Sequence, residues 1–198
     1  MRIYLRNRMV PACKAVRHRR EIAANLIGDT LALRSDAAIL SIAAGHLREM
    51  DDLGAGTLGP DQVVVAIDQD PMSLSLVKSR HSRVDTRALT ISDFIRQDFG
   101  SSCFDAVYAL GLFDYLTDKN AIRLLKAMVR CSRKHVLIGN FHPNAADAGY
   151  MEVFMDWKLA YRTSEDLMQL ANNIVEPNRS RTFSEPAGQI AFLELNVR

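Results

Sequence analysis

Ile39-Leu40-Ser41-Ile42-Ala43-Ala44-Gly45, followed by Val63-Val64-Val65-Ala66-Ile67-Asp68, is the stretch of sequence that decides the fold. Each half is an apolar run of strand length, which is typical of a strand buried on both faces of a parallel sheet. A turn of small residues follows the first run and lets the backbone approach a ligand closely, and an aspartate ends the second run. A carboxylate in that place can accept hydrogen bonds from both ribose hydroxyls. The stretch therefore predicts a βαβ unit that binds an adenosine-containing small molecule.

The turn of small residues is a weak signal on its own. Gly45 is the single glycine in it, and Ala43, His46 and Leu47 occupy positions where glycine would allow a closer approach of the backbone. Any buried strand that turns into a helix fits the same fragment, and His46 also fits a solvent-facing turn residue. The aspartate favours the nucleotide interpretation, because it follows the turn by about 20 to 25 residues, the spacing of a ribose-binding acid.

Length and charge limit the class of protein. The chain has 198 residues, 48% of them hydrophobic, which predicts one well-packed domain over residues 1–198 because two domains of ordinary size would need a longer chain. The net charge of +2 argues against a dedicated nucleic-acid binder, although Arg17-His18-Arg19-Arg20 is locally basic and is typical of a solvated helix face. We therefore expect a small-molecule substrate and no nucleic acid.

Cysteine usage and hydropathy indicate the compartment. Cys13, Cys103 and Cys131 are odd in number and widely spaced, so we expect reduced side chains and neither a disulfide framework nor a metal site. No apolar stretch reaches the roughly 18 residues of a membrane span. Arg and Lys interrupt the first twenty positions, which argues against a signal peptide. The expectation is a soluble, cytoplasmic protein.

Strand and helix candidates alternate along the chain. Beyond the two strands above, short apolar runs predict strands at 84–89, 104–110, 135–138 and 189–197. Helical spacing and capping residues predict helices that begin at Pro71, Ser92, Asp118 and near Thr163, with a helical cover segment over 1–35. Such alternation requires right-handed crossovers and a mostly parallel sheet with helices on both faces. Ligands bind at the carboxyl ends of the strands of such a sheet.

The most specific motifs stand later in the chain, at Gly111-Leu112-Phe113-Asp114-Tyr115-Leu116, Gly139-Asn140-Phe141, Tyr150-Met151-Glu152, Asp156-Trp157 and Tyr161-Arg162-Thr163. With the order of elements, they make the chain from about residue 12 onward resemble the class I S-adenosylmethionine-dependent methyltransferases. Within that class it is similar to the subfamily for biosynthesis of the extracellular factor 3-hydroxypalmitic acid methyl ester. The resemblance implies a Rossmann-like α/β sandwich, a seven-stranded, mostly parallel sheet with an antiparallel C-terminal strand, and an N-terminal helical cover.

The resemblance also implies S-adenosylmethionine as the cofactor. In the family pattern, the turn after the first strand contacts the methionine part, the end of the second strand binds the ribose and the adenine edge, a later segment meets the adenine ring, and another runs under the sulfonium. The matching residues here are Ala43, Ala44, Gly45, Asp68, Gln69, Ser92, Asp93, Phe94, Leu110 and Gly111. Asp93 also fits a helix cap.

The acceptor is expected over the ends of the fourth and fifth strands, under the N-terminal helix and residues 140–162. The polar groups available there are predicted to be catalytic at Tyr115, His142, Tyr161 and Arg162 and substrate-binding at Asp114, Asn140, Tyr150 and Glu152. His142 is the obvious proton acceptor by its intrinsic pKa, and Arg162 can pair with a substrate carboxylate.

Several of these residues have structural alternatives. Asp114 fits a cap of a helical turn, and Trp157 and Tyr161 at helical spacing fit core positions. Glu152 and Asp156 fit a solvated pair on one helix face, with Arg162 as their ion-pair partner.

Three functions remain open at the level of sequence. The first is methyl transfer from S-adenosylmethionine to a small carboxylic or hydroxy acid of secondary or signalling metabolism. The second is an intramolecular cyclisation of S-adenosylmethionine to a small-ring amino acid with release of methylthioadenosine, which enzymes of the same fold perform. The third is a sensor that binds S-adenosylmethionine without turnover. The sequence predicts the first, and it leaves the oligomeric state undetermined.

Overall fold

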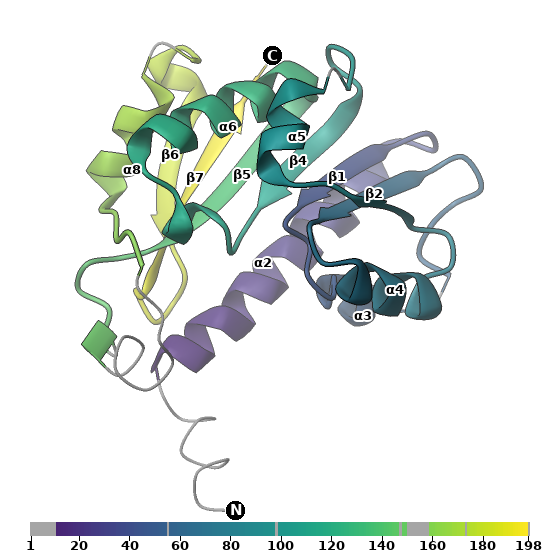
Figure 1. Ribbon diagram of the computed structural model, residues 1–198, viewed down its shortest axis with the longest axis horizontal. Helices are drawn as coiled ribbons and strands as arrows, with labels where there is room; N and C mark the ends of the chain where they lie inside the picture. The colour runs from purple at the N-terminus through teal and green to yellow at the C-terminus, as the bar shows by residue number, and fades with distance from the viewer. Residues whose placement is uncertain are drawn as a thin grey trace, which may run out of the picture.

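The computed structural model describes residues 11–54, 56–97, 99–146, 148–149, 159–172 and 174–197. In this part of the chain seven strands form one sheet, in the order β3-β2-β1-β4-β5-β7-β6 (Figure 1). The strands are β1 Ala38–Ile42, β2 Val63–Asp68, β3 Asp85–Ala88, β4 Phe104–Ala109, β5 Ser132–Phe141, β6 Ser180–Ser184 and β7 Ile190–Asn196. The helices are α2 Pro11–Leu33, α3 Glu49–Leu53, α4 Pro71–Arg80, α5 Ile91–Arg96, α6 Asp118–Cys131 and α8 Ser164–Ala171, with short 3₁₀ turns at Phe113–Tyr115 and Pro177–Arg179.

The direction of the strands confirms the expected sheet. Strands β1 to β5 pair in parallel, and β7 pairs antiparallel with both β5 and β6. Strand β7 therefore runs against the other six, as an antiparallel C-terminal strand should. The sequence patterns missed β6, because its residues are at most half-buried and show no continuous apolar run.

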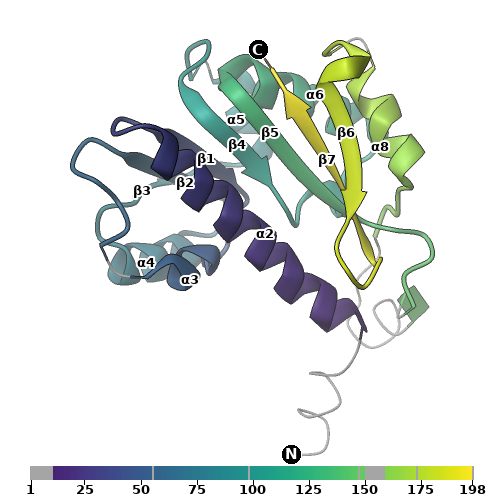
Figure 2. The ribbon, with the colours of Figure 1, turned by 180° about the vertical axis from the view of Figure 1, so that it is seen from behind.

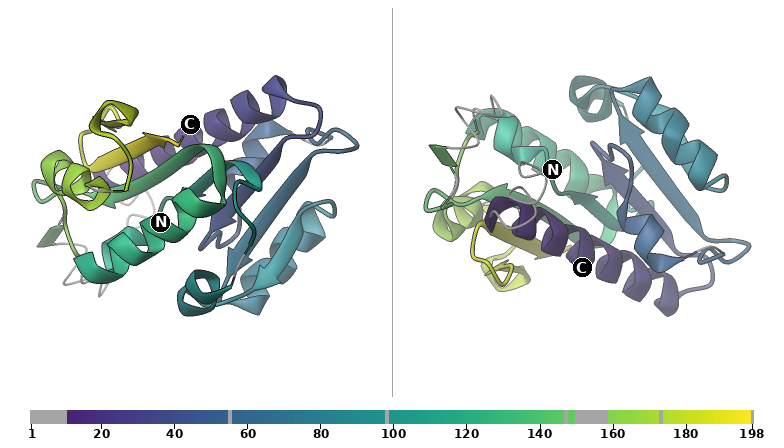
Figure 3. Two further views of the ribbon diagram at one scale, coloured as in Figure 1. Left: turned by 90° about the horizontal axis from the view of Figure 1, so that it is seen from above. Right: turned by 90° about the horizontal axis from the view of Figure 1, so that it is seen from below.

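Alternate residues of the central strands face two separate cores. In β1, Ile39 belongs to the core that includes α2, α3 and α4, whereas Leu40 belongs to the core that includes α5, α6 and α8. The same alternation holds in β4, where Tyr108 faces the first core and Val107 the second. Figure 2 shows α2 crossing one face of the sheet, and Figure 3 shows helices on both sides of it. The central strands are apolar on both faces, and helices cover both faces. The fold is therefore a three-layer sandwich.

Capping residues of the sequence open several of the helices. Pro71 opens α4 and Thr163 forms a capping box with Asp166 at the start of α8, as predicted. Asp70, which the sequence analysis did not single out, caps α4. Asp118 was expected to cap α6, but Thr117 occupies that position and Asp118 lies inside the first turn, where it pairs with Arg162. The predicted cap is therefore wrong, because a buried guanidinium engages the carboxylate.

The predicted cover segment corresponds to α2. This helix has 23 residues and buries small or branched side chains along its length, including Ala15, Ala23 and Ile27. Within the described residues, no helix combines the length and the apolar character needed to cross a bilayer. Tyr150, Glu152, Asp156 and Trp157, which the sequence analysis singled out, lie outside the described residues.

Candidate functional site

Two adjoining cavities lie at the carboxyl ends of β1, β2 and β4. The larger, of about 440 Å³, is bounded by one side of α2, by residues 41–49 after and at the end of β1, and by Tyr108, Leu110 and Gly111. The smaller, of about 280 Å³, is lined by Ile42, Ala43, Ile67, Asp68, Gln69, Leu89, Ile91, Phe94, Gly111, Leu112 and Tyr115. Ile42, Ala43 and Gly111 border both. One extended ligand can therefore occupy the two cavities, at the edge of the sheet where the sequence places the ligand.

The turn after β1 keeps a backbone shape that glycine would favour. Ala43, Gly45 and Leu47 have positive φ angles of 53°, 52° and 47°. For Ala43 and Leu47 such angles cost about 1 to 3 kcal/mol each, so the surrounding structure must hold them. Part of that support is a hydrogen bond from the Ala44 backbone N–H to the carbonyl of Ile67, at 3.0 Å. The turn thus follows a compact path, although Ala43 and Leu47 occupy positions where glycine would adopt these angles without strain.

Asp68 joins the turn to the end of β2. Its Oδ2 accepts a hydrogen bond from the Gly45 backbone N–H at 2.8 Å, and its Oδ1 accepts one from the Asp70 N–H at 2.9 Å. The carboxylate also lines the smaller cavity. Each oxygen retains a further lone pair, so both remain able to accept hydrogen bonds from a ligand hydroxyl.

The smaller cavity gathers part of the residues predicted for the adenosine. Asp68, Gln69 and Phe94, predicted for the ribose and the adenine, line it. Ala43 and Gly111, predicted for the methionine part and the sulfonium, line it too. The sequence analysis missed Leu89, Ile91 and Leu112, which add apolar surface, and placed Tyr115 with the acceptor although it lines this cavity with 56% of its surface exposed. An apolar slot beside a carboxylate suits a flat aromatic base joined to a sugar diol.

Ser92 and Asp93 do not line this cavity. Asp93 forms a capping box with Thr90 and an ion pair with Arg96 at 2.7 Å, and these contacts hold its pKa below the usual range. Ser92 faces a different hollow, beside Arg96 and Arg123. Asp93 therefore takes the helix-cap alternative and does not border the cavity predicted to hold the adenine. Phe94, the next residue, is buried and turns toward the cavity.

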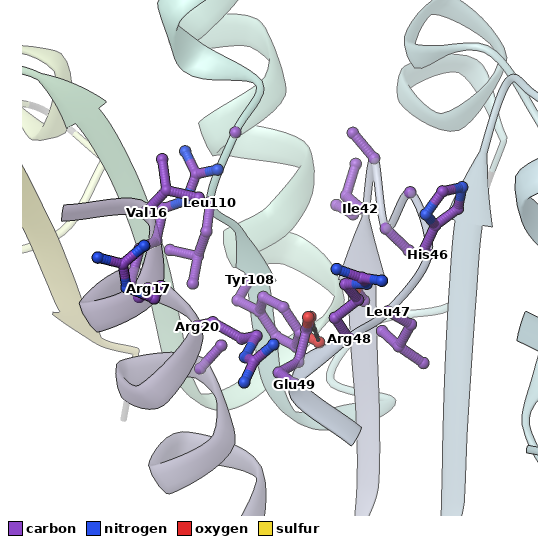
Figure 4. Close-up of a pocket in the computed structure, with 17 residues that line it drawn as sticks. Val16, Arg17, Arg20, Ile42, His46, Leu47, Arg48, Glu49, Tyr108 and Leu110 are labelled. Atoms are coloured by element: carbon purple, nitrogen blue, oxygen red, sulfur yellow. Dashed lines mark hydrogen bonds between the residues drawn. The ribbon is translucent and has the colours of Figure 1, made fainter. Parts of the chain in front are cut away.

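The basic cluster of α2 lines the larger cavity. Arg17, Arg19 and Arg20 all border it, and Arg48 borders it from the turn after β1. Figure 4 shows Arg17 and Arg20 on one side of the cavity and Arg48 on the other, with Tyr108 and Glu49 between them. Arg17 is exposed, as expected for a solvated helix face, whereas Arg19 and Arg20 are half-buried beside this cavity because α2 crosses the end of the sheet. The signal was present in the sequence, since the basic cluster lies inside the predicted cover segment.

Two contacts fix α2 over this cavity. Arg20 binds Asp52 of α3 through two nitrogens, at 2.7 and 2.8 Å. His18 lies on another side of the helix, and its Nδ1 is 3.2 Å from Oε2 of Glu185 in the hairpin between β6 and β7. The helix is therefore held to α3 and to the hairpin between β6 and β7.

A buried polar group forms the floor of the larger cavity. The Tyr108 hydroxyl donates a 2.6 Å hydrogen bond to Oε1 of Glu49 and interacts with Ser41. Burial raises the pKa of the Glu49 carboxyl, against the opposing effects of Tyr108 and the nearby Arg19 and Arg20. Burial also raises the pKa of Tyr108 well above its ordinary value. None of these residues was predicted, because Glu49 follows the turn outside any recognised motif.

Arg162 lies behind the cavities and has no donor to spare. It is 4% exposed, and its guanidinium binds Asp118 through Nε and Nη2, Asn140 and the Phe113 carbonyl through Nη1, and the Leu116 carbonyl through Nη2, at 2.6 to 3.1 Å. The predicted pairing with a substrate carboxylate is therefore wrong in this arrangement. The ion-pair alternative is correct in kind, with Asp118 as the partner.

Asn140 and Asp114 belong to the same internal network. Asn140 is fully buried and donates through Nδ2 to the carbonyl of Ala160 at 2.8 Å. Asp114 is 3% exposed, and its Oδ1 accepts a 2.6 Å hydrogen bond from the Phe141 N–H. Burial raises the pKa of Asp114 to about 6. These contacts attach the segment after β4 to the end of β5. Neither side chain borders the two cavities.

His142 and Tyr161 are likewise absent from the described walls of both cavities. The Nδ1 of His142 accepts a hydrogen bond from the Asn144 N–H at 3.1 Å, which is a turn contact. Tyr161 packs against the core that includes α2, in keeping with the core alternative. Of the four residues predicted to be catalytic, all of them described, only Tyr115 lines one of these two cavities, the smaller one.

Comparison with known proteins bears on the fold. No family model and no curated protein sequence matches the chain. A possible exported protein from Bordetella parapertussis is similar in structure, with a TM-score of 0.75 and 16% identity over 94% of this chain and 69% of that one. Magnesium protoporphyrin IX methyltransferase from Synechocystis PCC 6803, solved with bound SAH, gives 0.64 and 10% over 93% and 86%. The N-methyltransferase NodS from Bradyrhizobium japonicum WM9 gives 0.60 and 12% over 90% and 96%.

At these identities the similarity concerns the fold alone. Both methyltransferases superpose on this sheet and its helices over at least 90% of the chain and most of their own length. The chain therefore has the Rossmann-like fold of class I S-adenosylmethionine-dependent methyltransferases.

Proposed function

We propose that this protein is an S-adenosylmethionine-dependent methyltransferase that acts on a small-molecule acceptor. The observation that carries the proposal is Asp68, a carboxylate at the end of β2 that borders an apolar cavity continuous with a second, larger one. A fold does not by itself imply a function. The position of the cavities supports the proposal, because they lie at the strand ends where this fold binds ligands.

The residues present fit the cofactor. Asp68 would accept hydrogen bonds from the ribose hydroxyls, and Leu89, Phe94 and Leu112 would hold the adenine in the smaller cavity. Gly111 and Ala43, which border both cavities, would flank the part of the molecule that passes from one into the other. When bound, the cofactor supplies a methyl group on a sulfonium. The protein then has to orient the acceptor, exclude water and remove a proton where the acceptor is a hydroxyl.

The acceptor proposed from the sequence is a small carboxylic or hydroxy acid. The larger cavity supports an anionic acceptor, because arginines of α2 and Arg48 border it. A carboxylate needs no general base to attack a methyl group, so the absence of His142 from the described cavity walls does not weigh against this acceptor. The subfamily resemblance noted in the sequence points to the same chemical class.

The reaction class is tested by incubating the pure protein with S-adenosylmethionine, alone and with a panel of small carboxylic and hydroxy acids. We expect S-adenosylhomocysteine to form when a suitable acid is present, in an amount equal to the methylated acid. Conversion to methylthioadenosine without any acceptor, with an equal amount of a cyclic amino acid, would replace methyl transfer by cyclisation. Binding of the cofactor with no product from any of the acids would instead favour the sensor.

A further inference from the structure

Four cations share one exposed side of α6, which we call the basic face. Lys119, Arg123, Lys126 and Arg130 follow one another at intervals of four, three and four residues. At 3.6 residues per turn, they lie within about 60° of arc on the helix. All four are exposed. Figure 1 shows α6 with α5 beside it, and both helices pack on the core that does not include α2.

The basic face lacks acidic partners among the described residues. The acids of α5 and α6 are Asp93 and Asp118, which pair with Arg96 at 2.7 Å and with Arg162 at 2.8 Å. Arg130 donates to a backbone carbonyl beyond the end of α5 at 3.3 Å, and the other three cations have no hydrogen bond or ion pair within the described chain. Like charges at these spacings repel, and the first cation also lies at the positive end of the helix dipole. A bound anion would relieve both effects.

An apolar groove of about 290 Å³ lies beside the basic face, between α5 and α6. Its apolar part is formed by Ile91, Ile95 and Leu116, which are half-buried. Asn120 and Arg123 of α6 border the groove as exposed side chains. Arg123 therefore belongs both to the groove and to the basic face. A ligand with an apolar group in the groove would place its neighbouring groups against the cations.

The length of the basic face and the recessed position of the apolar residues indicate the class of ligand. From Lys119 to Arg130 the face extends about 16 Å along the helix, at 1.5 Å per residue, which is longer than a small metabolite. A bilayer surface binds protruding apolar side chains, and among the described residues neither α5 nor α6 carries an exposed large apolar side chain. Nucleic acid phosphates would use the cations and leave the groove unfilled. A protein segment can supply carboxylates and an apolar side chain together.

We propose that this surface docks an acidic segment of a partner protein. An apolar side chain of the segment fills the groove between α5 and α6, and flanking carboxylates pair with the basic face. Complementary charge guides such a partner to the surface, and the buried apolar side chain fixes its position. The basic face lies outside the two cavities of the proposed methyltransferase site, and Ile91 is the lining residue that the groove shares with the smaller one. The inference therefore does not depend on the proposed function.

The test compares two synthetic helical peptides that differ in one side chain. Both are rich in glutamate, and one has a leucine at its centre where the other has a serine. Calorimetric titration of the full chain should show the leucine peptide binding about 10-fold more tightly or better, as expected when a leucine side chain is buried. Binding of both peptides should weaken as salt is raised, because the cations are exposed.

Two variants separate the charge from the groove. Arg123→Gln should weaken both peptides by about 10-fold, because it removes the cation nearest the groove. Asn120→Trp adds a large side chain at the edge of the groove without changing the charge, and it should reduce the affinity of the leucine peptide to that of the serine peptide. Lys14→Gln is the matched control, because Lys14 is an exposed cation on α2, and it should change neither affinity. Thermal melts show that each variant is folded.

The inference fails if neither peptide binds, if the two bind equally, or if Lys14→Gln weakens them as much as Arg123→Gln does. Two further probes cover the other polyanions, a single-stranded DNA oligonucleotide and vesicles of phosphatidylglycerol and phosphatidylcholine in equal parts. Tighter binding of either probe than of the leucine peptide, weakened by Arg123→Gln and unaffected by Asn120→Trp, would replace the protein partner by a nucleic acid or a membrane.

Discussion

Replacing Asp68 by alanine tests the nucleotide site most directly. The carboxylate holds the Gly45 and Asp70 N–H groups at 2.8 and 2.9 Å and faces the smaller cavity. Loss of a charged acceptor for ribose should weaken S-adenosylhomocysteine binding by about 1.5 to 3 kcal/mol. That corresponds to roughly 10- to 150-fold in Kd, which calorimetric titration measures easily.

The same substitution should also lower stability, because two backbone donors lose their acceptor. Both sites are near the surface, so each loss should cost about 0.5 to 1.5 kcal/mol. A change of 1 kcal/mol shifts the Tm of a chain of this size by about 2 to 4 °C, so the expected fall is about 2 to 12 °C. A thermal melt beside the titration shows that the variant is folded at the temperature of the assay.

Asp70→Ala is the matched control. Asp70 caps α4 with hydrogen bonds to the Met72 and Ser73 N–H groups, and it does not line either cavity. Removing this cap should cost about 0.5 to 2 kcal/mol of stability and leave the affinity unchanged. If Asp68→Ala binds S-adenosylhomocysteine as tightly as the unsubstituted protein, or if Asp70→Ala weakens binding as much, the assignment of Asp68 to the ribose is refuted.

Three further predictions concern residues around the cavities. Asp93→Ala should leave cofactor affinity unchanged in titration and lower Tm by a few degrees, because Asp93 caps α5 and does not line the cavity. Arg162→Ala should cost about 3 to 5 kcal/mol of unfolding free energy in urea titrations, since it leaves Asp118 and three other acceptors without their donor; a variant as stable as the parent but with lower turnover would restore the catalytic assignment. The pKa of Asp114 is raised to about 6 from 3.8, so the folded protein holds its proton longer than the unfolded chain does, and this residue's contribution to stability should fall as pH rises from about 4 to 6. Urea midpoints at several pH values should show a smaller fall over that range in Asp114→Asn than in the unsubstituted protein, and an identical fall would contradict the prediction.

The nucleotide half of the site could be predicted because it depends on local sequence. A strand, a turn and the acid at the end of the next strand lie close together along the chain, so Asp68 and the turn at Ala43 to Gly45 reach the cavity as expected. Phe94 lines the smaller cavity and Asp93 does not, and the reason is also local. On a helix, adjacent residues point in different directions, so only one of them can face the cavity.

The acceptor half could not be predicted, because it depends on contacts far apart in the sequence. Arg19 reaches Gly111 only because α2 crosses the end of the sheet, and a basic run cannot by itself show what a helix covers. Arg162 fails as a catalytic candidate for a similar reason. Its partners lie 22 to 49 positions away, and no spacing rule shows that they use all of its donors.

The path of α2 also separates the residues that form the nucleotide pocket from the residues that wall the cavity for the second molecule. Every residue around the smaller cavity comes from residues 42–115, whereas the larger cavity needs residues 16–23 of α2 as its wall. The helix is attached to the rest of the protein through Asp52 and Glu185, outside the smaller cavity. Substitutions along α2 can therefore alter which second molecule is accepted while leaving the nucleotide pocket intact. Exchange of this one helix between related proteins is a route to new selectivity that keeps the nucleoside pocket constant.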